Sequence, residues 1–150
     1  ALPIFDGIVL PAIAMTSDKD QCSFLNEAGR CSIHMFRPGF CRLFPLGRVY
    51  DGTGFSYFLQ TGQCKKEHLA KVKVRQWINI PELKRYEQFV CDWHYFLKDL
   101  AKTSQGLSPE LIKTLHSYIL KVFYLTPYQD GSNFYDQFYM RLNDAKKLFL

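Results

Sequence analysis

The chain has 150 residues and a mass of 17.6 kDa, which is about the size of one domain. Hydrophobic residues make up 47% of it and charged residues 22%, so the composition excludes an intrinsically disordered protein. No apolar run approaches the roughly 20 residues that span a bilayer, which excludes a membrane-spanning helix. The net charge of +5 is mild and no nucleic-acid-binding pattern accompanies it, so nucleic acid is not expected as the partner.

The first part of the chain has the composition of loops and short strands. Four of the five cysteines and most of the glycines precede residue 65. The residues Asn-Glu-Ala-Gly at 26–29 predict a tight turn, and we expect this turn to join two short strands that carry Cys22 and Cys31. The residues Asp-Gly-Thr-Gly at 51–54 predict a second turn, which leads into a strand because the following residues alternate.

The remainder of the chain predicts helices. Apolar residues recur at three- and four-residue steps over 83–100, which predicts the first helix. A serine and a proline at 108–109 predict the start of the second, and Pro127 its end. A third helix is expected from near residue 132 to the end of the chain. The stretch 66–78 fits either a strand or a helix.

These elements predict the fold class and the domain organisation. We expect one α+β domain over 1–150, because helices and strands are segregated along the chain rather than alternating. The cysteine-rich region 1–65, built of loops and short strands, is expected to pack on an antiparallel helical region, 66–150.

The five cysteines do not suit a fully paired disulfide framework, because their number is odd and a chain of this size can form a core without such links. Cys91 falls within the first predicted helix and is expected to be a buried, small apolar residue. Cys22, Cys31, Cys41 and Cys64 each lie beside a turn, and nearby arginines and lysines favour the thiolate form that binds metals. We expect these four to be metal ligands.

Other residues near these cysteines are candidates for a supporting role. Arg37 and Arg42 can donate to backbone carbonyls around the site or offset the charge of several thiolates. His34 is a candidate ligand or hydrogen-bond donor, three residues after Cys31. Phe36 and the residues Phe-Pro-Leu at 44–46 are expected to form an apolar shell around the metal.

The metal itself stays open at this point. Four thiolates suit either a tetrahedral zinc site or a cubane iron–sulfur cluster. The cysteine spacing matches neither the common zinc-ribbon pattern nor the ferredoxin pattern.

The sequence around these cysteines resembles the YkgJ-type cysteine-cluster family, whose domain is taken to chelate zinc or iron. The matching words are Cys-Ser-Phe-Leu at 22–25, Gly-Arg-Cys-Ser-Ile at 29–33, Arg-Pro-Gly-Phe-Cys-Arg-Leu-Phe-Pro at 37–45, and the further Cys64. The resemblance extends to about residue 100, and no pattern is evident in 101–150. Members carry an additional cysteine cluster upstream, which this sequence lacks, so we expect either a lost N-terminal part or a reduced ligand set.

The resemblance implies a metal-binding protein of a bacterial, cytoplasmic kind. A [4Fe–4S] cluster with a redox or maturation role is the first expectation, which leaves a redox enzyme as an open alternative. A zinc site closed by four thiolates would instead make it a structural interaction domain. A third possibility is a binding module that uses the basic stretch 65–85 for an anionic partner.

The last third of the chain is unusually rich in aromatic residues. We expect some of them to line a surface for a protein partner or for a missing N-terminal segment. The residues concerned are Tyr124, Tyr128, Phe134, Tyr135, Phe138 and Tyr139.

Overall fold

The computed structural model describes residues 4–5, 7–16, 21–62 and 70–150. The chain forms two compact units, one made of Ala1–Ala14 with Asp92–Leu150 and the other of Met15–Cys91. The unit that holds the cysteines therefore extends past the expected boundary at residue 65 and includes the first turns of the helix predicted over 83–100. Whether both units belong to one domain stays a prediction.

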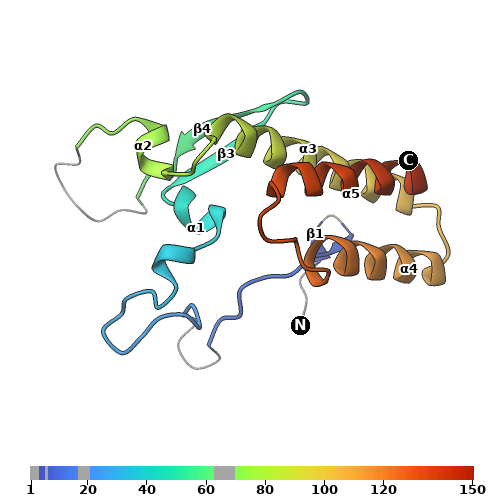
Figure 1. Ribbon diagram of the computed structural model, residues 1–150, viewed down its shortest axis with the longest axis horizontal. Coiled ribbons are helices and arrows are strands. Elements are labelled where there is room, and N and C mark those ends of the chain that lie inside the picture. Colours follow the sequence, from blue (N-terminus) through green and yellow to red (C-terminus); the bar gives the residue numbers. More distant parts are fainter. Residues whose placement is uncertain (1–3, 6, 17–20, 63–69) are drawn as a thin grey trace. The chain divides into compact units, whose positions relative to one another are not determined.

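The unit Met15–Cys91 is built around a β-hairpin (Figure 1). Strand β3 (Leu46–Tyr50) pairs antiparallel with β4 (Phe55–Leu59), in a register that sets Arg48 opposite Tyr57. The predicted turn at 51–54 and the predicted strand after it are both confirmed.

The hairpin turn is held by the Asp51 carboxylate. Its Oδ1 atom accepts hydrogen bonds from the amides of Thr53 at 3.0 Å and Gly54 at 2.7 Å. These bonds hold the pKa of Asp51 below its ordinary value, because they stabilise the ionised form. Gly52, at φ +103°, supplies the left-handed conformation that the turn requires.

Short helices complete this unit. They are the 3-10 helix η1 (His34–Phe36), α1 (Gly39–Leu43), α2 (Val74–Ile78) and the first turns of α3 (Leu83–Ser104). The stretch 70–78, ambiguous in sequence, is irregular up to residue 73 and helical from Val74 to Ile78. The buried side chains Leu43, Ile78 and Tyr86 form the centre of the unit.

The other unit contains the remaining helices and a small N-terminal hairpin. The strands β1 (Ile4–Phe5) and β2 (Ile8–Val9) pair antiparallel, and His116 Nε2 lies 2.9 Å from the carbonyl oxygen of Gly7. The helices are the rest of α3, α4 (Pro109–Ile119), the π-helix η2 (Leu120–Leu125) and α5 (Phe134–Phe149).

The helix starts follow from capping chemistry. Ser108 Oγ accepts the amide of Leu111 at 3.4 Å, with Pro109 at the first helical position of α4. Asn133 Oδ1 accepts the amide of Tyr135 at 2.9 Å and begins α5 one residue after the expected start. The three predicted helices are thus confirmed in position.

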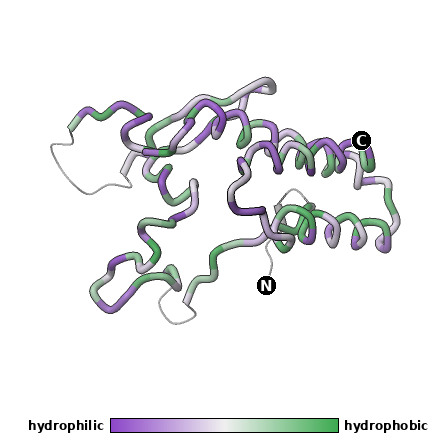
Figure 2. The backbone as a smooth tube through the Cα atoms, in the orientation of Figure 1, coloured by the Kyte–Doolittle hydropathy of each residue, from purple (hydrophilic) through white to green (hydrophobic). Residues whose placement is uncertain are grey.

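An aromatic core joins these helices. The Trp93 ring lies 4.6 Å from Phe123 and 5.8 Å from Phe138, measured between ring centres. Phe138 is 2% exposed, so it belongs to the core and not to a partner surface. Along these helices hydrophobic and hydrophilic residues alternate in short blocks, as the apolar stripes predict (Figure 2).

The second helix departs from expectation at its end. Instead of continuing as an α-helix up to Pro127, the chain widens after Ile119 into the π-helix η2. Arg141 donates to the carbonyl oxygens of Thr126 at 2.9 Å and Pro127 at 2.8 Å, and its guanidinium stacks 3.9 Å from the Tyr128 ring. These bonds satisfy carbonyls that the helix end leaves free.

The α+β fold class is confirmed. Two-stranded antiparallel sheets lie in the first part of the chain, and the longer helices lie after residue 82. No helix in the described ranges combines the length and apolar character needed to cross a bilayer.

Candidate metal centre

A short hairpin places the first two cysteines. Leu25 and Cys31 form an antiparallel bridge, and the Leu25 amide donates to the Cys22 carbonyl at 3.0 Å. The turn between them is closed by Asn26, whose Oδ1 accepts from the Arg30 amide at 2.9 Å. The predicted turn at 26–29 is confirmed, but the strands expected beside it are single bridges, Cys22 with Met15 and Cys31 with Leu25. Cys22 and Cys31 are half-buried and free.

Helix α1 places the third cysteine. Pro38 is the N-cap of this helix, and its carbonyl accepts the Cys41 amide at 3.0 Å. Because Pro38 has a fixed φ and cannot extend a helix backward, the chain turns here after η1. Cys41 is half-buried and free as well.

The three cysteines lie close enough for their charges to interact. Burial raises the pKa of the Cys41 thiol, and the neighbouring Cys22 and Cys31 raise it further. The Arg37 guanidinium acts in the opposite direction and lowers the same pKa. Mutual repulsion of this kind is relieved when a cation binds the thiolates, so the arrangement suits a metal centre.

The described side chains do not yet form a coordination shell. In the ranges that the structure covers, no group of three or more His, Cys, Asp or Glu side chains is placed to hold a metal ion. Cys64, the fourth expected ligand, lies outside the described residues. Cys91 is buried in α3, as expected, and its thiol donates to the Thr53 carbonyl at 3.8 Å.

Arg42 connects the cysteine-bearing loop to helix α2. Its Nε donates to the Arg37 carbonyl at 3.3 Å, and its two terminal nitrogens donate to Met35 at 3.1 Å and Asn79 at 3.2 Å. Asn79 is the left-handed residue that ends α2, with φ 48°. A planar guanidinium can reach three carbonyls at once, which a lysine ammonium on a flexible stem cannot do.

Arg42→Lys is therefore expected to lower the free energy of unfolding by about 1–3 kcal/mol, since hydrogen bonds to a charged group are lost while the charge is kept. Denaturant unfolding followed by circular dichroism measures this change. Arg30→Lys is the matched control, because the Arg30 side chain is exposed. Equal stability of the two variants would contradict the connecting role of Arg42.

The other supporting residues differ in their placement. Arg37 Nε is buried and has no hydrogen-bond partner among the described residues, which leaves a donor available near Cys41. His34 is exposed in η1. The expected apolar shell is wrong for Phe36 and Phe44, which are 86% and 51% exposed and do not shield the cysteines from water.

The comparison with family models decides the identity of this segment. The model of the CxxCxxCC family, described as a putative zinc- or iron-chelating domain, matches residues 9–67. This segment is thus similar to the cysteine-cluster family over 59 of the 150 residues. The resemblance found in the sequence is thereby confirmed over this segment, and metal binding is its supported function. No curated protein and no solved structure shows significant similarity to the chain.

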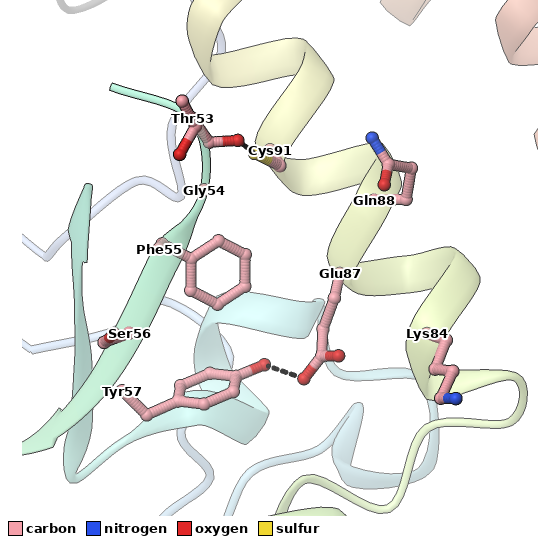
Figure 3. Close-up of a pocket in the computed structure, with 9 residues that line it drawn as sticks. All are labelled: Thr53, Gly54, Phe55, Ser56, Tyr57, Lys84, Glu87, Gln88 and Cys91. Atoms are coloured by element: carbon pink, nitrogen blue, oxygen red, sulfur yellow. Dashed lines mark hydrogen bonds between the residues drawn. The ribbon is translucent and has the colours of Figure 1, made fainter. Parts of the chain in front are cut away.

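A second feature of the unit Met15–Cys91 was not predicted from the sequence. A pocket of about 670 Å³ lies between β4 and α3 (Figure 3). Phe55 and Tyr57 project from β4 toward α3, and the Tyr57 hydroxyl donates to Glu87 Oε1 at 3.0 Å. Burial and the Glu87 carboxylate raise the pKa of Tyr57. In the sequence, the one indication of this pocket is that Phe55 and Tyr57 are two residues apart and therefore lie on the same face of the strand.

Proposed function

We propose that the chain holds an iron–sulfur cluster through the thiolates of Cys22, Cys31 and Cys41, with Cys64 as the fourth ligand, and that it serves in redox or maturation chemistry. The observation that carries the proposal is the convergence of three free half-buried thiols within the segment that the family model matches. When bound, such a cluster supplies a one-electron redox centre.

The two candidate centres place their thiolates differently. Around one zinc ion at about 2.3 Å, four sulfurs stand about 3.8 Å apart. A cubane cluster binds each thiolate to a different iron, so its sulfurs stand farther apart. The charge interaction of Cys41 with Cys22 and Cys31 suits either centre, and the metal content distinguishes the two.

The charges around the cysteines support the same proposal. Several thiolates carry a net negative charge, which needs nearby cations or donors. Arg37 lowers the pKa of Cys41 and has a buried Nε without a hydrogen-bond partner in the described part of the chain. That N–H group can donate to a thiolate sulfur and so favour the charged form.

The test is the metal content of the full chain purified without oxygen. We expect a brown protein with a broad absorption near ~400 nm and about four irons per chain. A colourless protein with about one zinc per chain would replace the cluster by a structural zinc site. Folded protein that takes up neither metal would overturn the proposal.

A further inference from the structure

The same unit carries an apolar groove away from its cysteines. It has a volume of about 580 Å³ between the open end of the hairpin and helix α2. Its walls are Phe44, Pro45, Leu46, Leu59, Val72 and Trp77. Four of these side chains are about half exposed: Phe44 51%, Leu59 55%, Val72 50% and Trp77 45%. Large apolar side chains gathered in this way mark an interaction site more often than an ordinary surface.

The groove is a built feature and not a loose loop. Trp77 Nε1 donates to the Phe44 carbonyl at 3.0 Å, which holds the indole against the chain that leaves α1. Gln60 pairs with Pro45 and Leu46, since its amide donates to the Pro45 carbonyl at 3.0 Å and its side chain to the Leu46 carbonyl at 3.3 Å. These hydrogen bonds tie the two walls of the groove to the hairpin and to α2.

The rim of the groove is cationic. Lys71 lines it, and Lys73 and Arg75 are the immediate chain neighbours of the groove residues Val72 and Val74. All three basic side chains are exposed and, within the described residues, none of them makes an ion pair with a carboxylate. The stretch 70–79 contains no acidic residue. A partner that fits must therefore carry apolar side chains beside negative charge.

We propose that this groove docks an acidic amphipathic helix of a partner protein, with its apolar side chains in the groove and its carboxylates on Lys71, Lys73 and Arg75. Binding in this way is the helix-in-groove type of recognition. A hollow accepts protruding side chains, whereas a bilayer surface is penetrated by apolar side chains that protrude from the protein. The concave shape thus favours a peptide over an anionic membrane.

The experiment uses the full chain and a synthetic probe. The probe is a labelled helical peptide of about 14 residues, with Leu on one face and Glu on the other, and its counterpart carries Lys in place of Glu. We expect the Glu peptide to bind and to shift the tryptophan emission to shorter wavelength, because the half-exposed Trp77 indole leaves water, while Trp93, the other tryptophan, packs on Phe123 in the other unit. Binding should weaken between about 0.05 M and about 0.5 M salt. The Lys peptide should not bind.

Two variants locate the site. Val72→Glu and the double change Lys71→Glu with Lys73→Glu should each weaken binding of the Glu peptide by about tenfold or more. Leu111→Glu and Lys113→Glu are the matched controls, because these residues are exposed on α4 in the other unit, and they should bind as the unchanged chain does.

Three outcomes would overturn the docking proposal: equal binding of the two peptides, unchanged binding by the groove variants, or binding to phosphatidylglycerol vesicles with no binding to the Glu peptide. The result is independent of the metal proposal, because neither the groove residues nor the rim residues are among the proposed ligands.

Discussion

Cys41→Ser is expected to lower the affinity of the chain for its metal by more than about 100-fold, because losing a ligand costs more than losing a group that only supports one. Both Cys22 and Cys31 raise the pKa of the Cys41 thiol, so Cys41 is the described cysteine that interacts with each of the other two. Iron and zinc content per chain, measured after anaerobic purification, checks the result.

Cys91→Ser is the matched control for this change. Cys91 is buried in α3, where its thiol donates to the Thr53 carbonyl, and it is not among the proposed ligands. The metal content should therefore stay the same in this variant. Full metal content in Cys41→Ser would remove Cys41 from the ligand set, and loss of metal in Cys91→Ser alone would move the site to another part of the unit.

Gly39→Ala is expected to lower the free energy of unfolding by about 1–3 kcal/mol through overpacking. A Cβ atom on Gly39 would lie 2.8 Å from Tyr86 Cζ, closer than real side chains allow. Tyr86 has little room to move, because it is 9% exposed and its hydroxyl accepts from Arg48 at 3.0 Å. Gly39 begins α1, so a shift of this helix also moves Cys41.

The sign of the change in the free energy of unfolding distinguishes the steric contact with Tyr86 from the higher helix propensity of alanine. Without the contact, alanine in place of glycine would stabilise a helix by about 0.5–1 kcal/mol. Gly106→Ala is the control without a steric contact: Gly106 lies in the turn after α3 and nothing lies within 4 Å of a Cβ there, so the stability of this variant should not fall. Denaturant unfolding of both variants gives the comparison. A Gly39→Ala chain as stable as the unchanged protein would show that Tyr86 yields without cost.

The cation beside Tyr86 explains why this part of the unit is sensitive. The Arg48 guanidinium lies 5.2 Å from the ring centre of Phe55, 5.8 Å from Tyr57 and 5.5 Å from Tyr86. Each of the three rings stabilises the guanidinium charge through a cation–π interaction, and the strength of that interaction depends on the position of the ring. Displacement of Tyr86 therefore also disturbs Arg48 and the hairpin that carries it.

Local elements and candidate ligands were predictable from the sequence because they depend on neighbouring residues. Apolar spacing predicts α3, a capping serine with proline predicts α4, and the glycine-containing turns predict both hairpins of the cysteine unit. The words around Cys22, Cys31 and Cys41 identify the family, since they lie within one continuous segment.

The tertiary structure alone decided which distant residues meet. Arg42 reaches Asn79 across 37 positions, Trp77 reaches Phe44 across 33, and Tyr57 reaches Glu87 across 30. The periodicity of the apolar residues also does not predict the π-helix η2 or the hydrogen bonds from Arg141 to the carbonyls that follow it. Periodicity and capping report interactions within a few residues, whereas these contacts arise only when separate elements pack, and so the groove, the pocket and the placement of the thiols could not be predicted.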